Sequence, residues 1–415
     1  MRRAQAGIAV VADIVDISAT HGPSGPDARP AASAGRPLIP LEAVPLPLWR
    51  ELCDRAAEPN AYYLADWELA VNAFAPGRTG SMALAAWQGA PSRLIGLMPV
   101  VPLWRAFGIA LPALVSAHPY GTLCTPLLDS DEAQDAASEL LRASRHAGAR
   151  ALVLREVALD GPTVAALTKT LRREDLRPRV LRWHDRACLD ASRDADTLLR
   201  EALGAKKLKE LRRQRHRLAE HGEVSFEVTR TPREVADALE IFLSLEASGW
   251  KGKHGTALAQ VPGDAAFIRR ATRALSEAGR CEIVTLRAGD IPVAAGIVLR
   301  HQDRAFFFKL GVDERFARYS PGVQLTLELT RHLCADPAIT SADSTAAPDH
   351  PMINPIWRGR LAIADMLIPL RRNDPVVALI HGMLLARQAA HHAARRVLHF
   401  VRSRRKWSVS KTSPL

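Results

Sequence analysis

The stretch FFFKLGVDERFARYSPGVQL, residues 306–325, decides the fold class. Its aromatic beginning, which runs up to Lys309, is typical of a buried strand. After a loop, Ser320 and Pro321 predict the start of a helix, because Ser is favoured at the N-cap and Pro at the first helical position. Free N–H groups and the positive dipole end favour an anion such as phosphate there, and Gly322 would let a ligand approach the backbone. An ordinary capped helix has the same pattern.

Strands and helices alternate along the whole chain, which indicates a mixed α/β fold. In the first half we expect strands at 82–87, 93–102 and 151–157, and helices at 47–57, 63–74, 132–146 and 164–172. In the second half we expect strands at 282–287, 292–300 and 304–309, and helices at 198–221, 232–246, 264–278 and 321–334.

A glycine spacing connects the two halves. Gly89 and Gly96 lie in one expected hairpin, and Gly289 and Gly296 lie at the same spacing in another. Two unrelated hairpins would give the same spacing, but the similar order of elements favours a tandem repeat of one α/β unit. We therefore expect a flexible segment rich in Pro, Gly, Ala and Ser, two α/β domains and a basic helical C-terminal extension, at residues 1–36, 37–195, 196–372 and 373–415 respectively.

The net charge of +12 is concentrated in two places. Residues 373–415 carry eight basic residues against one acidic, and residues 206–217 carry seven against one. In the second stretch, leucines fall on one face of the expected helix, so the cations form a solvated face or, alternatively, contact a polyanion. We expect the helical tail from Val376 to Trp407 to dock its apolar half on the core. Peripheral contact of its basic end with an anionic membrane is the alternative.

Composition excludes several classes of protein. With 47% hydrophobic and 24% charged residues, the chain is neither disordered throughout nor fibrous. The five cysteines show no C-x-x-C spacing, so we expect no disulfide framework. The histidines His381, His391 and His392 have no carboxylate or thiolate nearby in the sequence, so we expect no metal site. We find no signal peptide and no apolar run long enough to span a membrane, and we expect a cytoplasmic location.

Four stretches, taken together, resemble the successive motifs of the CelD or BcsL-like acyltransferases. They are LKELRRQRHRLAEHG, LEASGWKGKHGTAL, IPVAAGIVL and residues 306–325, and the resemblance covers residues 196–335. That family belongs to the GNAT acetyltransferase superfamily and is structurally similar to the FemABX aminoacyltransferases. The resemblance implies two tandem GNAT-like domains, each with a mixed sheet that splays in the middle, and an acyl-CoA donor. In place of the superfamily signature Q/R-x-x-G-x-G/A, this chain has RYSPGV at residues 318–323.

The resemblance also suggests roles for particular residues. Donor-binding candidates lie on the aromatic strand and at the following helix start: Phe308, Arg318, Tyr319, Ser320, Gly322 and Val323. Lys309 would hold the oxyanion or the acceptor's carboxylate, and Glu246 would be the general base. Trp250, Lys251 and Asp343 would shape the acceptor pocket.

Each of these candidates also has a structural interpretation. Lys309 would then be a strand-end lysine that reaches solvent, and Trp250 would be a core residue in a loop. Asp349 and His350 are a second candidate base in a turn-rich loop, where the same residues are common for local hydrogen bonding. A Ser, His, Asp hydrolase triad is disfavoured because no G-x-S-x-G motif accompanies it. In the first half, residues 118–121 (HPYG) are of similar types, and we expect them to be structural.

The predicted function is N-acyl transfer from acetyl-CoA or another acyl-CoA to a small amine, linked to cellulose, exopolysaccharide or cell-envelope biosynthesis. One alternative is FemABX-like transfer from an aminoacyl-tRNA, which residues 206–217 would contact. Another is a non-catalytic GNAT-fold accessory protein of a polysaccharide synthesis or export system.

Overall fold

A computed structural model describes residues 37–90, 92–390 and 393. The segment expected to be flexible, 1–36, and the tail expected to be helical beyond 390 lie outside the described residues, apart from residue 393. Each of the eight helices predicted in the two halves has a close counterpart among ten α-helices of the described residues. These are α1 (Leu46–Asp54), α2 (Ala65–Phe74), α3 (Leu103–Phe107), α4 (Ala133–His146), α5 (Pro162–Arg173), α6 (Ala195–Leu218), α7 (Pro232–Ser248), α8 (Trp250–Lys253), α9 (Pro262–Glu277) and α10 (Pro321–Cys334), of which α3 and α8 were not predicted.

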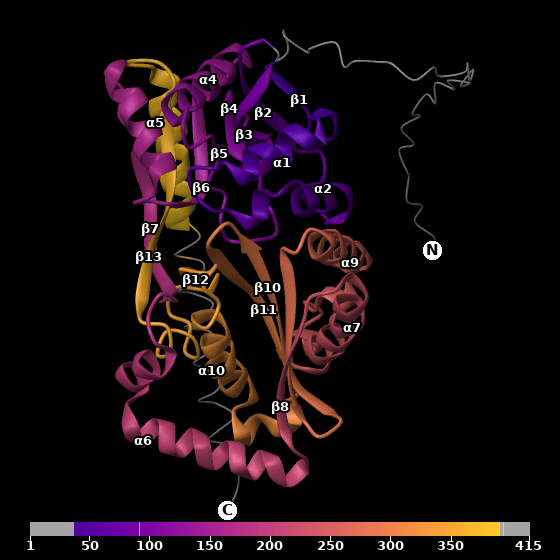
Figure 1. Ribbon diagram of the computed structural model, residues 1–415. Coiled ribbons are helices and arrows are strands. Elements are labelled where there is room, and N and C mark those ends of the chain that lie inside the picture. The colour runs from indigo at the N-terminus through magenta and orange to yellow at the C-terminus, as the bar shows by residue number, and fades with distance from the viewer. Residues whose placement is uncertain (1–36, 91, 391–392, 394–415) are drawn as a thin grey trace, which may run out of the picture. The chain divides into compact units, whose positions relative to one another are not determined.

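The described strands form one mixed sheet, in the order β1-β2-β3-β4-β6-β13-β7-β12-β11-β10-β9-β8, with β5 paired to β3 (Figure 1). Their bounds are β1 (Leu38–Pro40), β2 (Met82–Gln88), β3 (Arg93–Pro102), β4 (Ala113–Ser116), β5 (Leu127–Leu128), β6 (Ala151–Ala158), β7 (Arg179–Asp190), β8 (Val224–Thr229), β9 (Cys281–Ala288), β10 (Ile291–His301), β11 (Arg304–Val312), β12 (Ser341–Asp343) and β13 (Gly359–Pro369). The mixed α/β fold class, with helices flanking a large mixed sheet, is confirmed.

The strand order repeats on the two sides of the central pair β7–β13. The antiparallel hairpin β2–β3 is followed by β4, which runs parallel to β6. The hairpin β9–β10 is followed by β11, which runs parallel to β12. Gly89 and Gly289 sit in the two hairpin turns with φ of +74° and +58°, where glycine is favoured because it has no Cβ. The two hairpins therefore hold corresponding places in the sheet.

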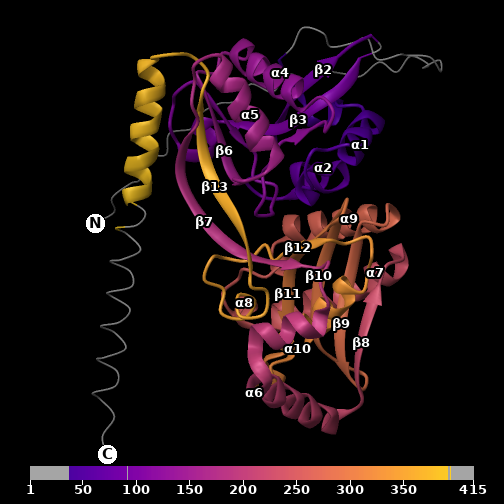
Figure 2. The same ribbon diagram turned by 60° about the vertical axis from the view of Figure 1, so that its left-hand side comes forward.

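The central strands are shared between the halves. β7 ends the first half in sequence but pairs with β12, and β13 ends the second half but pairs with β6 (Figure 2). The two also pair with each other from Gly359 to Leu367. The domain boundaries at 37–195 and 196–372 stay a prediction. With these boundaries, the last strand of each domain, β7 or β13, pairs with strands of the other domain.

Helices cover both faces of the second half's sheet. Along β9, Ile283 packs in the cluster that contains α7, whereas its neighbour Val284 packs in the cluster that contains α10. This alternation is what a strand buried on both faces requires. Helix α10 is thereby placed directly behind β11, the strand that begins the sequence stretch 306–325.

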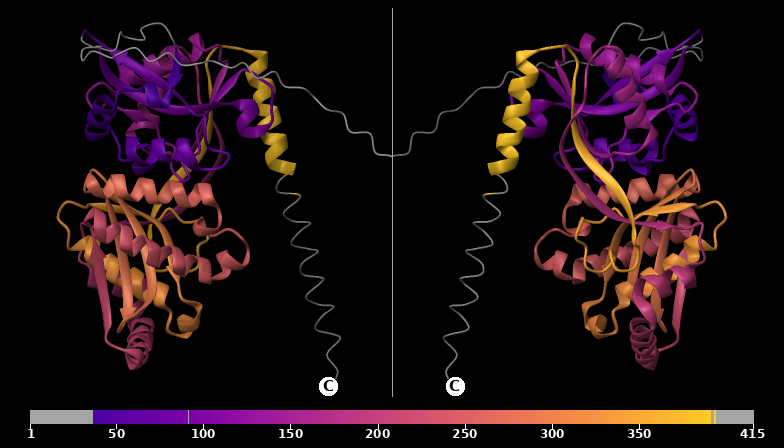
Figure 3. Two further views of the ribbon diagram at one scale, coloured as in Figure 1. Left: turned by 90° about the vertical axis from the view of Figure 1, so that its right-hand side faces the viewer. Right: turned by 90° about the vertical axis from the view of Figure 1, so that its left-hand side faces the viewer.

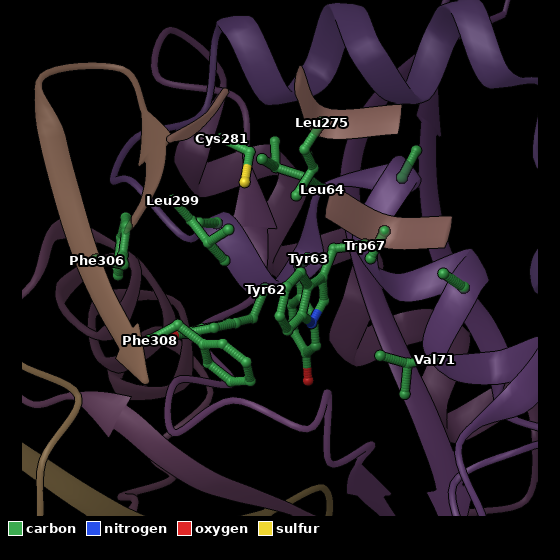
Figure 4. Packing of buried hydrophobic residues seen from close by; sticks show 14 of the residues in the cluster. Tyr62, Tyr63, Leu64, Trp67, Val71, Leu275, Cys281, Leu299, Phe306 and Phe308 are labelled. Carbon is green, nitrogen blue, oxygen red and sulfur yellow. The ribbon is translucent and has the colours of Figure 1, made fainter. Parts of the chain in front are cut away.

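One aromatic core joins the two halves. Tyr62 and Trp67 from the first half pack edge-on against Phe306 and Phe308 from β11, with ring centroids 4.9 Å apart for Trp67 and Phe308 and 5.7 Å apart for Tyr62 and Phe306 (Figure 4). Edge-to-face pairs of this kind add to the free energy gained by burying the rings. The start of β11 is consequently held rigidly against the first half.

Residues 375–390 form a helix that packs on the first half (Figure 3). Val377, Ile380 and Leu384 contact a cluster that includes Val115 and Leu367. The apolar part of the predicted tail helix therefore docks on the core, as expected. No helix in the described part of the chain is long and apolar enough to cross a membrane.

A buried ion-pair network ties α10 to the sheet and makes stability depend on pH. Glu282 of β9 accepts a hydrogen bond from His332 Nε2 at 2.7 Å and pairs with Arg300 of β10. Burial alone would raise the pKa of Glu282, but the hydrogen bonds from His332 and Arg300 outweigh it and lower the pKa to about 2. A carboxyl whose pKa is depressed on folding stabilises the fold above its ordinary value, and this contribution is lost as the pH falls toward 2.

We expect Glu282→Gln to lower the free energy of unfolding at pH 7 by roughly 3 kcal/mol, the equivalent of a depression from 4.5 to about 2. Urea unfolding of both proteins at pH 7, 4.5, 3 and 2 measures this. The difference in the free energy of unfolding should shrink below pH 4.5, because the Glu282 carboxyl of the wild type then takes up a proton and its ionised form no longer stabilises the fold. A difference that stays constant across this range would show that the network contributes nothing through ionisation.

Candidate functional site

The site lies where β11 separates from β12. Residues Arg304–Phe306 of β11 pair with Ser341–Asp343 of β12, and β11 then continues to Val312 without pairing to β12. On its other side β11 stays paired with β10, with a bulge that leaves Phe308 between the pairs Val298–Phe307 and Ile297–Lys309. Bulges re-aim the side chains beside them. Lys309 follows this bulge, at the edge of the opening.

Lys309 is paired with a buried carboxylate. Its Nζ lies 3.5 Å from Glu246 Oε1, and Glu246 Oε2 accepts a hydrogen bond from Leu258 N at 2.9 Å. The Glu246 side chain is 1% exposed and the Lys309 side chain 21% exposed. The ammonium therefore faces the surface while the carboxylate beneath it compensates its charge. Glu246 therefore holds the Lys309 ammonium in place, and its role as general base stays a prediction.

The first half contributes a tyrosine to the same place. The Tyr120 hydroxyl donates to Asp264 Oδ2 at 2.7 Å, and Lys309 Nζ lies 5.8 Å from the centre of its ring. The Arg78 guanidinium lies over the same ring at 4.3 Å. Burial and the hydrogen bond to Asp264 raise the pKa of Tyr120, so its hydroxyl keeps its proton. A lysine, a tyrosine and an arginine thus lie together beside β11.

Backbone strain fixes Tyr120 in position. Its φ is +62°, in the left-handed region, and its N–H donates to His118 Nδ1 at 3.2 Å. Burial, followed by the charges of Arg155 and Arg78, lowers the pKa of His118 to about 4, so the ring is neutral and accepts. A Cβ on Gly121 would lie 2.3 Å from the Tyr62 ring. Of residues 118–121, which we expected to be structural, Tyr120 lies beside Lys309.

The start of α10 differs in detail from the prediction. Pro321 is the first helical residue, as predicted, but the Ser320 side chain makes no capping hydrogen bond, because its backbone adopts φ +54°. A Cβ on Gly322 would lie 3.0 Å from Leu310 Cδ2 and 3.2 Å from Val312 Cγ1. The glycine therefore allows α10 to pack closely on β11, which is a reason for its presence apart from any ligand.

The neighbouring residues that we expected to bind the acyl donor differ in how far they are buried. Tyr319 is buried and its hydroxyl lies 3.0 Å from His221 Nε2, while the Arg318 guanidinium lies 4.7 Å from the centre of the Tyr319 ring. Phe308 belongs to the aromatic core, and Val323 is half-buried. The structure thus exposes Arg318 and leaves Ser320 and Val323 half-buried, whereas Phe308, Tyr319, Pro321 and Gly322 are buried.

Comparison with known proteins assigns a domain family to part of the chain. Residues 205–350 match the acetyltransferase (GNAT) domain family. The matched segment contains Lys309, Glu246 and the start of α10. A search of curated proteins gave no match.

Two of the solved structures that match this chain illustrate the shared fold. FemX superposes with a TM-score of 0.53 and 12% identity, over 81% of this chain and 98% of that one. The C-terminal domain of a putative lysylphosphatidylglycerol synthetase from Agrobacterium fabrum superposes with a TM-score of 0.50 and 15% identity, over 82% of this chain and 96% of that one. At these identities the likeness concerns the fold alone.

Asp343, expected to bind the acceptor, is an internal residue in the GNAT-matched segment. It forms an ion pair with Arg186 of β7, and both side chains are fully buried. Arg186 NH1 also donates to the Thr122 carbonyl at 2.6 Å, and Asp343 Oδ1 accepts from Thr345 N at 2.8 Å. Thr345 Oγ1 in turn donates to the Phe307 carbonyl at 2.7 Å. The pair therefore anchors the chain that borders the opening between β11 and β12.

The described contacts of Asp349 and His350 do not include Lys309. Asp349 is exposed, and His350 is half-buried with its Nδ1 accepting from Ile353 N at 3.4 Å. Burial lowers the pKa of His350. Trp250 and Lys251 begin α8, directly after α7 and close in sequence to Glu246. Among the described residues, no group of three or more metal-ligating side chains is found.

Proposed function

We propose that the chain is an N-acyltransferase that moves an acyl group from an acyl-CoA, such as acetyl-CoA, to a small amine, with the second half catalytic. The observation that carries the proposal is the Lys309–Glu246 pair at the separation of β11 and β12, inside the segment that matches the GNAT domain. A partly exposed ammonium above a buried carboxylate is a preorganised positive charge, which is what a developing oxyanion requires.

The residues present fit an acyl-CoA donor. The edge of β11 beyond Phe306 is not paired with β12, and the helix start at Pro321 offers N–H groups and a positive dipole end to phosphate. We infer that Arg318 and the backbone of Ser320 to Val323 would hold the diphosphate. Bound acyl-CoA would supply the thioester that the amine attacks.

The chain's own residues would then perform positioning and charge stabilisation. Lys309 Nζ would donate to the carbonyl oxygen as it becomes negative, and Glu246 would keep Lys309 ionised and oriented. The protonated Tyr120 hydroxyl, oriented by Asp264, would face the acceptor. Glu246, His350 and Asp349 remain the candidates for accepting the proton of the amine.

The alternative is a FemABX-like aminoacyl transfer, which the fold shared with FemX and the basic helix α6 favour. Its donor would be an aminoacyl-tRNA. A CelD or BcsL-like role in exopolysaccharide or cell-envelope biosynthesis would fit either chemistry. So would a non-catalytic accessory role. Contact of the basic tail with an anionic membrane would place the protein at that membrane in any of these functions.

Calorimetry with two ligands separates these functions. We expect acetyl-CoA to bind with a dissociation constant in the micromolar to millimolar range typical of enzyme substrates, and uncharged tRNA to bind more weakly and in a strongly salt-dependent way. Binding of tRNA without acetyl-CoA binding would favour aminoacyl transfer. If neither acetyl-CoA nor tRNA binds, the result would favour the non-catalytic accessory role.

A further inference from the structure

Helix α6 is broken at Gly204, where φ is +72° and ψ is 162°. Beyond the break, Leu208 and Leu211 are buried, and Gln324 Nε2 of α10 donates to the Leu211 carbonyl at 2.8 Å. Figure 2 shows α6 beside α10. The break lets both segments of α6 lie against α10, with cations of α6 flanking the seam.

A cavity of about 340 Å³ lies along this seam. Its volume falls within the range of about 300 to 1,000 Å³ that is usual for small-molecule sites. Its walls consist of four leucines, four arginines, two acidic residues and a glutamine: Leu199, Leu208, Leu211 and Leu327; Arg200, Arg212, Arg215 and Arg331; Asp196 and Glu328; and Gln324. The cavity thus combines an apolar wall with an excess of positive charge.

The acidic residues are already used to hold two of the arginines. Glu328 Oε1 lies 3.1 Å from Arg215 NH1 and 3.4 Å from Arg331 NH1, and Asp196 Oδ1 lies 3.2 Å from Arg331 Nε. Within the described part of the chain, Arg200 and Arg212 form no ion pair. These two guanidinium groups at the cavity are therefore available to bind an anion.

We propose that the α6–α10 cavity binds a phosphate-bearing nucleotide, with Arg200 and Arg212 on the phosphate and the leucines against the base. The planar guanidinium matches phosphate oxygens in pairs, which makes arginine the preferred residue for this contact. The cavity has the volume for a nucleotide and not for a nucleic-acid helix. The phosphorylated adenosine end of a CoA molecule and a free nucleotide share this chemistry.

Adenosine 3′,5′-bisphosphate is the probe that tests the site. We expect it to bind the full chain in calorimetry at low ionic strength. Arg212→Gln should weaken binding by about 10- to 100-fold, the equivalent of one charge-assisted hydrogen bond. Arg213→Gln is the matched control, because Arg213 loses the same charge from the next position of α6 but does not line the cavity. Its dissociation constant should stay within about twofold of wild type.

Further ligands identify the source of the phosphate. Weaker binding of dephospho-CoA than of CoA, with the difference abolished by Arg212→Gln, would assign the site to the CoA donor. Equal binding of the two, with the bisphosphate still sensitive to Arg212, would assign it to a separate nucleotide. No binding of the bisphosphate, or equal weakening by both variants, would overturn the proposal. Binding of tRNA but not of the bisphosphate would also overturn it, in favour of a nucleic-acid face.

The outcome is independent of acyl transfer. Lys309→Ala should leave the bisphosphate affinity unchanged, since Lys309 does not line the cavity. A chain without transferase activity that still binds the bisphosphate through Arg212 would refute the proposed function and retain this site.

Discussion

Replacement of Lys309 by alanine should lower the kcat of acyl transfer by about 10²- to 10³-fold, while the affinity for CoA stays within about twofold of wild type. Losing one preorganised donor to a transition-state oxyanion has an effect of this size. A group that acts mainly in the transition state changes kcat more than it changes ground-state binding. The release of CoA from acetyl-CoA in the presence of a panel of small amines measures kcat, and calorimetry measures affinity.

Lys169→Ala is the control for this experiment, because Lys169 is an exposed lysine on α5 in the first half. It should behave as wild type in both measurements.

Tyr120→Phe removes the hydroxyl that pairs with Asp264 and should raise KM for the amine more than it lowers kcat. If Lys309→Ala keeps full turnover with every amine that wild type accepts, Lys309 is only a strand-end lysine, and the chemistry must be sought around Asp349 and His350.

Replacement of Asp343 by alanine should lower the free energy of unfolding by about 3 to 5 kcal/mol. It would leave Arg186 as a fully buried charge without its carboxylate, and breaking a buried pair by removing one partner has a cost of this size. Urea unfolding followed by tryptophan fluorescence measures the change. Asp349→Ala is the control, because Asp349 is exposed, and it should change stability by no more than about 0.5 kcal/mol.

A double variant tests the physical reason. Arg186→Met with Asp343→Leu removes both charges, so it should be clearly more stable than Asp343→Ala alone. An Asp343→Ala variant that unfolds like wild type yet binds the amine weakly would instead support the role in acceptor binding that the sequence suggested.

Gly322→Val, which the sequence suggests as a test of phosphate binding, is expected to act through packing as well. The added methyl groups would meet Leu310 and Val312 on β11 before any ligand is considered. Loss of CoA affinity in that variant would therefore need to be compared with its stability.

Much of the fold follows from local sequence patterns. The hairpins around Gly89 and Gly289, the strand from Arg304 and the helix from Pro321 all have clear apolar periods and turn residues, and they form where these predict. The physical reason is that turn geometry and the side-chain period are properties of neighbouring residues. Strands β7 and β13 were not predicted. Half of the residues of Arg179–Asp190 are exposed, and the segment forms a strand by pairing with β12 and β13, which come much later in the sequence.

The sequence by itself determined the α/β class, the hairpins, and Lys309 and Glu246 as candidates. Only the tertiary structure decided which side chains meet. Glu246 reaches Lys309 across 63 positions of sequence, and Arg186 reaches Asp343 across 157. Tyr120 joins the site from the other half because the shared core and the exchanged strands β7 and β13 bring the halves together. Such contacts depend on long-range packing, which no local pattern of residues encodes.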